Sequence, residues 1–217
     1  MSTLLEAQAY VGTDETCGRV QLEILKREGL LPHMNVLEIG CGCLSAGVPL
    51  MQALCIGGYV GLEPNRWLVE AALAEERIKR IAVESLATFL HKSDFDASEL
   101  GRKFDFVLSH SVLSHCARWQ VEQYLKHAAA VLAPTGKIVA SLRLTEPNGY
   151  GSQGSPDGKE SNFSQWQYPG VAYYRHSTIA ALALKCGLST MRRPQHTQLL
   201  TSVVPKDFHD WMVFSKI

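Results

Sequence analysis

The stretch Val36-Leu-Glu-Ile-Gly-Cys-Gly42 decides the fold class of this chain of 217 residues. Residues 35–39 are a short, almost wholly apolar run of the kind that builds a strand buried on both faces of a parallel sheet. Glycines then end the run, because a tight turn needs unusual backbone angles and a missing Cβ lets the backbone approach a bound ligand closely. A helix is expected at 48–54. The order of strand, glycine turn and helix predicts an α/β domain with a ligand site after its first strand.

Further strands and helices alternate along the chain. Strands are predicted at 59–62, 87–91, 104–109 and 137–142, and helices at 16–29, 66–80, 118–132 and 178–186. A turn is expected at 133–136, and Ser177 and Gly187 should cap the two ends of the last helix. Since a tight turn cannot reach a parallel partner, this order predicts right-handed crossovers in a doubly wound, mostly parallel sheet. Strands at 188–192 and 210–215 are candidates for an antiparallel hairpin at its edge.

The composition is that of an ordinary globular protein. Hydrophobic residues make up 46% of the chain and charged residues 19%, which is enough apolar surface for one core. Lysine plus arginine equals aspartate plus glutamate at 21 each, so no net charge attracts nucleic acid or anionic membranes. A small-molecule or peptide substrate is therefore favoured. The first ten residues lack a signal-peptide pattern and no stretch approaches the ~20 apolar residues of a membrane span, which predicts a cytoplasmic protein.

Six cysteines are scattered along the chain, as Cys17, Cys41, Cys43, Cys55, Cys116 and Cys186. They form no C-x-x-C pair, so reduced and mostly buried thiols are expected. Cys41 and Cys43 flank a glycine in the predicted turn, but a structural zinc site would need two further ligands nearby in sequence. The sequence therefore predicts no metal.

A single domain is expected to span residues 1–217, with two parts outside the alternating core. Residues 1–30 form a helical lead-in. Residues 145–170 are rich in Gly, Ser and Pro and also carry four aromatic side chains. A compact domain rarely keeps so long an irregular segment without a use, such as a lid over a site. A disordered surface insertion is the equally weighted alternative.

A carboxylate follows the second predicted strand in Gly61-Leu-Glu63-Pro. At the end of that strand it can accept hydrogen bonds from both hydroxyls of a ribose. A solvated turn residue is the alternative. Together with the glycine turn, Glu63 favours a ligand that contains a nucleoside.

Four motifs resemble class I S-adenosylmethionine-dependent methyltransferases. Besides the opening stretch, these are Gly61-Leu-Glu-Pro-Asn65 for the acidic loop, Phe104-Asp-Phe-Val-Leu-Ser-His-Ser-Val-Leu-Ser-His115 for the fourth strand, and Val131-Leu-Ala-Pro-Thr-Gly-Lys-Ile138 for the approach to the fifth. They follow the family's order and spacing over roughly residues 16–142, so together they are far more specific than any one alone. The resemblance implies S-adenosylmethionine as cofactor, S-adenosylhomocysteine as product, and the family's antiparallel last strand.

The resemblance also implies which residues hold the cofactor. Gly40 and Gly42 would shape the loop around its methionine part, and Glu63 would bind the ribose. Glu38 would either contact the cofactor or fix the glycine loop by accepting backbone N–H bonds. Cys43-Leu-Ser45 departs from the family by lacking the third glycine often seen there.

Further positions complete the cofactor set that the resemblance implies. Asp94 and Phe95 would flank the adenine, although Asp94 could instead cap a turn with Ser93. Ser109, at the end of the fourth strand, would lie near the sulfonium. Arg19 could meet the cofactor carboxylate, because Tyr10-Val-Gly-Thr-Asp-Glu-Thr-Cys-Gly-Arg19 resembles the lead-in of some small methyltransferases.

Two histidines in the fourth-strand motif are candidate catalytic residues. Imidazole is the side chain best suited to take a proton at neutral pH, which favours His110 and His115. Both could instead be structural, with His115 bonded to the backbone at a helix start. His176, Tyr173 and Tyr174 are further pocket candidates.

The predicted function is transfer of a methyl group from S-adenosylmethionine to O or N of a small molecule. A sulfonium already makes the methyl carbon electrophilic, so the protein needs chiefly to align the acceptor for in-line displacement and to exclude water. One alternative is a nicotinamide-dependent oxidoreductase, which prefers a glycine where this chain has Ser45. The other is a module that binds the cofactor without chemistry. A monomer or a homodimer is expected.

Overall fold

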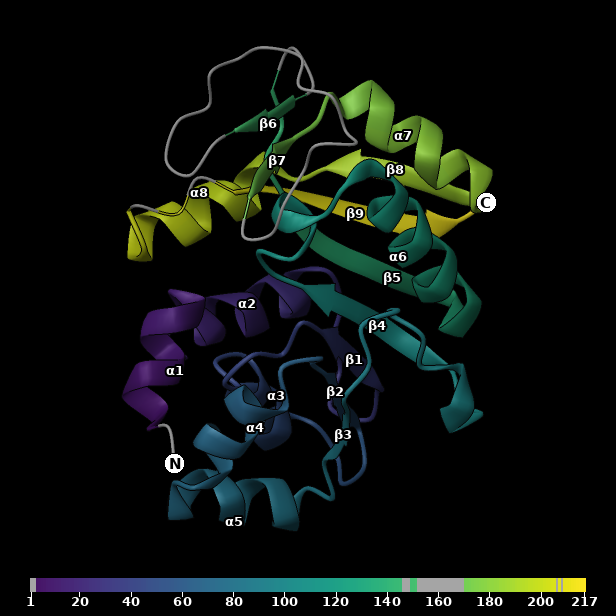
Figure 1. Ribbon diagram of the computed structural model, residues 1–217. Coiled ribbons are helices and arrows are strands. Elements are labelled where there is room, and N and C mark those ends of the chain that lie inside the picture. Colours follow the sequence, from purple (N-terminus) through teal and green to yellow (C-terminus); the bar gives the residue numbers. More distant parts are fainter. Residues whose placement is uncertain (1–2, 146–148, 152–169, 206, 208) are drawn as a thin grey trace.

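The computed structural model describes residues 3–145, 149–151, 170–205, 207 and 209–217. Its centre is a seven-stranded sheet in the order β3-β2-β1-β4-β5-β9-β8 (Figure 1). The strands are β1 (Val36–Ile39), β2 (Tyr59–Leu62), β3 (Thr88–Leu90), β4 (Phe104–Ser109), β5 (Leu132–Leu142), β8 (Leu188–Arg192) and β9 (Asp210–Lys216). The pairs among β1 to β5 are parallel. The predicted doubly wound, mostly parallel sheet is therefore confirmed.

The antiparallel strand lies one position in from the edge of the sheet. Strand β9 pairs antiparallel with β5 on one side and with β8 on the other, so β8 takes the edge. The expected pairing of the last two strands is correct. However, their connection is not a tight hairpin, because helix α8 (Pro194–Val203) lies between them. Proline at its start suits a first helical turn, where a missing N–H costs nothing.

Helices cover both faces of the sheet (Figure 1). Helices α6 (Arg118–Val131) and α7 (His176–Lys185) pack on one face. The other face is covered by α1 (Leu4–Val11), α2 (Glu15–Arg27), α3 (Gly47–Ala53), α4 (Arg66–Leu73), α5 (Glu76–Glu84) and α8. Within β1, Leu37 packs toward the first group and Val36 toward the second. Burial from both sides is why this strand is almost wholly apolar.

The predicted helix at 66–80 is wrong in its continuity, because α4 ends at Leu73 and α5 begins at Glu76. Buried positions in α4 end with Ala72, and the next one is Ile78 in α5. Apolar residues on one helix face recur every three to four positions, and a step of six residues does not fit this spacing. One straight helix could therefore not bury both Ala72 and Ile78 on the same face. Glu75 adopts an extended conformation and lets the second helix realign.

Two smaller expectations also need correction. Helix α7 begins at His176 with Arg175 at its N-cap, so Ser177 lies inside the helix and does not cap it. The turn expected at 133–136 is a bulge within β5, since Phe104 pairs with Leu132 and Phe106 already pairs with Lys137. Proline at 134 cannot donate a ladder hydrogen bond, which suits it to such a bulge.

The possible lid at 145–170 lies mostly outside the described residues. Its described parts are Thr145, Gly170 and the strand β6 (Gly149–Gly151), which pairs antiparallel with β7 (Val171–Tyr173). Short 3-10 turns complete the described elements at Ser98–Leu100 and Leu113–His115. Among the described residues, none of the helices has the length and apolar character that crossing a bilayer requires.

A buried carboxylate ties the C-terminal part of the chain to α2. Glu28, with 5% of its side chain exposed, accepts hydrogen bonds from Arg193 at 2.6 Å, His196 at 2.8 Å and Lys137 at 3.1 Å. Burial alone would raise the pKa of Glu28, but these partners outweigh it and lower the pKa to about 2. The ionised form therefore stabilises the fold.

Acidification should remove that stabilisation. Because the folded-state pKa lies below the ordinary value of 4.5, the contribution is complete above pH 4.5 and is lost as the pH falls toward 2. Between pH 6 and pH 3, the free energy of unfolding measured in urea should fall by about 2 kcal/mol less in Glu28→Gln than in wild type, because pH 3 still lies above the folded-state pKa. Glu23→Gln, whose carboxylate makes an exposed helix pair with Arg27, should behave as wild type. Equal pH dependence in all three proteins would contradict the assignment.

Candidate active site

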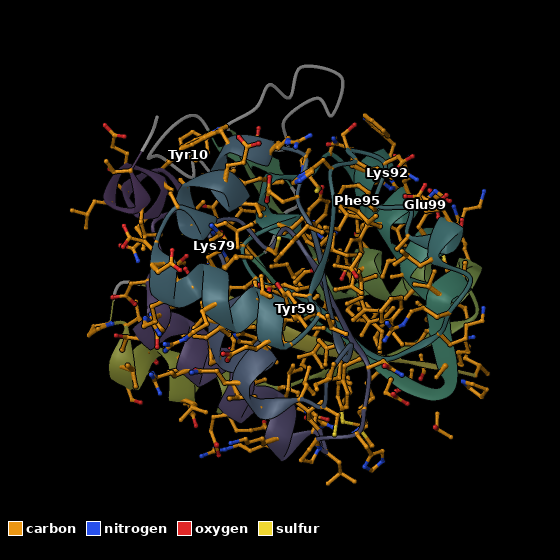
Figure 2. All side chains as sticks on the ribbon, turned by 90° about the horizontal axis from the view of Figure 1, so that it is seen from below. Tyr10, Tyr59, Lys79, Lys92, Phe95 and Glu99 are labelled. Atoms are coloured by element: carbon orange, nitrogen blue, oxygen red, sulfur yellow. The ribbon has the colours of Figure 1, made fainter. Side chains whose placement is uncertain are left out.

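A cavity of about 740 Å³ opens at the carboxyl ends of β1, β2 and β4. Strand β1 lies between β2 and β4, so the chain leaves it in opposite directions and a crevice forms there. Side chains from the N-terminal segment, the strand ends and the loop after β3 line it. Those used below are Tyr10, Thr13, Gln21, Glu38, Gly40, Gly42, Ser45, Glu63, Lys92, Phe95, His110, Val112 and His115. Tyr10 lines the cavity from the N-terminal segment, while Lys92 and Phe95 line it from the loop after β3. Figure 2 shows Tyr10 well apart from the other two, so the two segments contribute at different ends of the cavity.

The glycine loop after β1 needs its glycines for two reasons. Gly40 and Gly42 have φ angles of 78° and 51°, a region that disfavours other residues. A Cβ on Gly40 would also stand 2.3 Å from the Val112 side chain. Gly40 is therefore needed for close packing against the segment after β4, and not only for the approach of a ligand.

The same loop is pressed against helix α2. A Cβ on Gly18 would lie 1.7 Å from the carbonyl oxygen of Ser45, far inside any allowed contact. Glycine in a helix interior costs about 0.5–1 kcal/mol relative to alanine, so its presence here reflects the packing. Helix α2 and the loop thus form one wall of the cavity.

Glu63 joins the ends of β1 and β2. One carboxylate oxygen accepts the Gly42 amide at 3.1 Å and the other accepts the Asn65 amide at 2.9 Å. Burial raises the pKa of Glu63, and these backbone donors partly offset the effect. The Glu63 carbonyl oxygen lies 2.8 Å from Nδ1 of His91, which directly follows β3. This contact links the loop after β2 to the end of β3. A carboxylate offers about four acceptor positions, so Glu63 keeps capacity for ligand hydroxyls.

Glu38 lines the cavity beside Glu63 but has a different environment. Its carboxyl accepts the Tyr59 hydroxyl at 2.6 Å. Burial, together with the nearby Glu63, raises the pKa of Glu38 to about 8, so the protonated form prevails at neutral pH. A protonated carboxyl can donate as well as accept. The alternative role for Glu38 was to fix the glycine loop by accepting its backbone N–H groups. Among the described residues, no amide of that loop donates to Glu38.

The N-terminal segment reaches the cavity with residues other than Arg19. The Arg19 side chain is 67% exposed and pairs with Glu15 at 2.6 Å. Gln21, two positions on, is 2% exposed and lines the cavity. A helix turns about 100° per residue, so positions 19 and 21 face nearly opposite sides. The structure therefore does not bring Arg19 to the site.

Polar atoms of this segment are available to a ligand. The Thr13 and Ser45 hydroxyls lie 3.1 Å apart, and both residues line the cavity. Gln21 donates its amide to Cys17 Sγ at 3.5 Å, while its buried carbonyl oxygen has no hydrogen-bond partner among the described residues. An orphaned buried acceptor is costly unless a ligand or water satisfies it.

Of the remaining cofactor candidates, only Phe95 lines the cavity. Its φ angle is 63°, an unusual value for this residue type, and its ring meets Tyr124 edge-on at 5.7 Å. Asp94 accepts the Asp96 amide at 3.0 Å, which is a turn cap of the kind weighed as the alternative. Ser109 is fully buried and hydrogen-bonded to the Tyr124 hydroxyl at 2.7 Å. The structure does not bring Asp94 or Ser109 to the cavity.

His110 belongs to a buried hydrogen-bond network that was not predictable from the residues alone. Its Nε2 lies 3.0 Å from Asp207 Oδ2, and the two side chains are 6% and 8% exposed. Asp207 Oδ1 also accepts the Nδ1 of His209 at 2.7 Å and the His209 backbone amide at 3.0 Å. His209 Nε2 in turn lies 3.1 Å from the Ser114 hydroxyl. The His110 ring stacks on Trp211 with centroids 5.5 Å apart.

The charges of this network follow from burial and hydrogen bonds. Burial alone would raise the pKa of Asp207, but the hydrogen bonds from His110 and His209 hold it well below its usual range. Burial lowers the pKa of His209, so that ring is neutral at pH 7. Asp207 is therefore an ionised carboxylate held between two imidazoles.

Cys17 stands next to the same network. Its Sγ, a His110 ring nitrogen and an Asp207 oxygen all lie within 4.8 Å of one another, a combination that can bind a metal ion. Burial raises the pKa of Cys17 to about 11, which favours the thiol over the thiolate that a metal needs. That a metal is not used remains a prediction. All six cysteines are free thiols, as expected.

The other candidates make contacts of their own, outside the network around His110. His115 lines the cavity and its Nδ1 lies 2.9 Å from the Gly170 carbonyl oxygen, as expected for a backbone-bonded histidine. Tyr174 is buried and donates its hydroxyl to the Cys116 carbonyl at 2.6 Å. His176 and Tyr173 are not among the described residues that line the cavity.

Comparison with known proteins identifies a family model, described as a methyltransferase domain, that matches residues 37–138. The chain is also 26% identical over 153 residues to an uncharacterized methyltransferase from Schizosaccharomyces pombe. That match covers 69% of this chain and 47% of the yeast protein. The chain thus spans about half the length of this relative.

Solved structures with the same fold include magnesium protoporphyrin IX methyltransferase from Synechocystis PCC 6803 with bound S-adenosylhomocysteine. It is 20% identical with a TM-score of 0.62, and the match covers 100% of this chain and 89% of that one. A glycopeptide N-methyltransferase, also complexed with S-adenosylhomocysteine, is 15% identical with a TM-score of 0.64 over 94% and 91% of the two chains. At these identities the likeness establishes the fold.

Proposed function

The chain has the class I S-adenosylmethionine-dependent methyltransferase fold and its residues 37–138 belong to the methyltransferase domain family, and on that premise we propose that it methylates an oxygen or nitrogen of a small-molecule acceptor. The supporting observation is Glu63, which spans the ends of β1 and β2 at the cavity wall with acceptor capacity to spare. A nucleoside sugar is the ligand that such a carboxylate suits.

The residues around the cavity fit the cofactor. Glu63 would accept the ribose hydroxyls, and Phe95 would pack against the adenine. The orphaned carbonyl oxygen of Gln21 would accept the ammonium of the methionine part. Thr13 and Ser45 carry hydroxyls that can donate to its carboxylate, in the role first assigned to Arg19.

The chemistry is divided between cofactor and protein. When bound, S-adenosylmethionine supplies a methyl carbon already activated by its sulfonium. The protein must hold the acceptor in line with that carbon, exclude water and provide for any proton that is released. His110 is the proposed base, because it lines the cavity and has an ionised carboxylate behind it. His115 is proposed as a second polar contact for the acceptor.

A titration separates this function from its two alternatives. S-adenosylhomocysteine should release heat on binding with micromolar affinity or better, while NAD should release none. The result expected of a nicotinamide-dependent oxidoreductase is the reverse. Incubation with S-adenosylmethionine labelled in its methyl group, together with a metabolite library, should then move label into an acceptor. Binding without any transfer of label would favour the non-catalytic module.

The balanced charge of 21 basic and 21 acidic residues supports a small-molecule acceptor rather than nucleic acid or a membrane. Free thiols at all six cysteines suit the reducing cytoplasm, where we propose the protein acts. The proposed assembly is a monomer or a homodimer.

A further inference from the structure

The network behind His110 defines where each of its protons lies. Asp207 is an acceptor only, because it is ionised, so the His110 Nε2 that faces it at 3.0 Å must carry a hydrogen. The same reasoning places a hydrogen on His209 Nδ1, which faces Asp207 at 2.7 Å. His209 Nε2 is then an acceptor and receives the Ser114 hydroxyl. In this one arrangement of protons, each of these hydrogen bonds has one donor and one acceptor.

This arrangement leaves Nδ1 of neutral His110 as the basic nitrogen. A neutral imidazole has one N–H and one lone pair, so a hydrogen on Nε2 places the lone pair on Nδ1. Among the described residues no hydrogen bond occupies Nδ1, and His110 lines the cavity. Ring rotation is restrained by stacking on Trp211 and by the next residue, Ser111, whose amide is held by the Ser141 hydroxyl at 2.8 Å.

The ionisable groups that face the ring come from three elements of the fold. From the segment before β9, Asp207 supplies a negative charge, while His209 beside it is neutral. From α2, Cys17 faces the pair as an uncharged thiol. From the end of β5, Arg143 acts on His209 at longer range. A proton gained by His110 would form an ion pair with Asp207, which stabilises the product of proton transfer.

We propose, on the basis of the proposed methyl transfer, that Asp207 with His209 is a positioning pair that fixes His110 as a base acting through Nδ1, and that the acceptor is an alcohol or phenol. A neutral amine attacks without losing its proton first, and a carboxylate has none to lose, so neither requires such a base. A carboxylate would also need a cation, but Lys92 is the only lysine or arginine among the described lining residues and it is paired with Asp94 and Glu99.

The transfer then balances as follows for a hydroxyl acceptor. The acceptor oxygen forms its bond to the methyl carbon while the carbon–sulfur bond of the cofactor breaks and its electron pair stays on sulfur. The hydroxyl proton moves to His110 Nδ1 and afterwards to solvent. The products are a methyl ether and neutral S-adenosylhomocysteine, and no further reactant is required.

The decisive experiment reads the tautomer of His110 in the ligand-free protein by ¹⁵N–¹H NMR. Wild type should show hydrogen on Nε2. In Asp207→Asn the side-chain amide can donate to that nitrogen, which should move the hydrogen to Nδ1, by the logic known for triad proteases. Asp210→Asn, three residues away, should leave the tautomer as in wild type. Hydrogen on Nδ1 in wild type, or an unchanged tautomer in Asp207→Asn, would overturn the proposal.

Binding and transfer supply independent arms of the test. Asp207→Asn should keep its affinity for S-adenosylhomocysteine within about twofold, which shows that it is folded, while transfer falls about tenfold to a hundredfold. In the labelled library, label should appear on hydroxyl compounds, and label only on amines or carboxylates would refute the acceptor class. Failure of wild type to bind S-adenosylhomocysteine would sink the proposed function alone, because the tautomer is read without cofactor.

Discussion

Glu63→Gln should weaken binding of S-adenosylhomocysteine by roughly a hundredfold or more. Glutamine has the same shape, but only one arm accepts hydrogen bonds, so either the Gly42 or the Asn65 amide loses its acceptor. Ribose hydroxyls would also lose a charged partner. Hydrogen bonds to charged groups contribute about 1.5–3 kcal/mol each, and two of them exceed a hundredfold in affinity.

Calorimetric titration measures this effect, with Glu70→Gln as the matched control. Glu70 is 61% exposed and pairs with Arg66 on α4, so its variant should bind like wild type. Burial raises the pKa of Glu63, so wild-type affinity should also fall on acidification at a higher pH than an ordinary carboxylate would give. A loss smaller than fivefold in a folded Glu63→Gln protein would exclude Glu63 as the main ribose contact.

His110→Ala should lower kcat for a hydroxyl acceptor by about a thousandfold, within the range that general bases contribute. Affinity for S-adenosylhomocysteine should stay within about twofold, because the proposed cofactor contacts lie elsewhere in the cavity. His110→Gln keeps more of the packing on Trp211 and should show the same loss. Agreement between the two variants separates lost proton transfer from a packing defect.

His127→Ala is the matched control. His127 lies on α6, its Nδ1 is 3.6 Å from the Asp96 carboxylate, and neither residue lines the cavity. It should turn over like wild type. His115→Ala should fall between the two, because its Nδ1 is already engaged by the Gly170 carbonyl. Unchanged turnover of His110→Ala at saturating substrate would eliminate His110 as the base.

Motifs next to strand ends were predictable because local sequence fixes both their conformation and their place in a parallel sheet. Gly40, Glu63 and His110 each lie directly after a strand, Gly42 lies three residues after one, and all four line the cavity. The sheet brings the ends of β1, β2 and β4 to one edge without further information. This part of the site therefore follows from the strand pattern.

Residues that depend on tertiary placement were not predictable in the same way. Asp207 meets His110 across 97 positions, and it does so because β9 enters the sheet beside β5. The prediction of Arg19 rests on the resemblance of its segment to the lead-in of some small methyltransferases, whereas the apolar stripe of α2 at Val20, Ile24 and Leu25 indicates which face is buried. The helical period was thus the available signal, and it favours Gln21 over Arg19.

The contact at Gly18 has a consequence for protein engineering. The glycine loop owes its shape partly to a helix whose backbone lies against Ser45 with no room for a methyl group. A graft of residues 40–46 into another scaffold would therefore have to carry residues 14–21 with it. Ligand binding at this end of the cavity therefore depends on both segments together, although a motif search treats them as unrelated. A transplant of either segment alone would lose the binding.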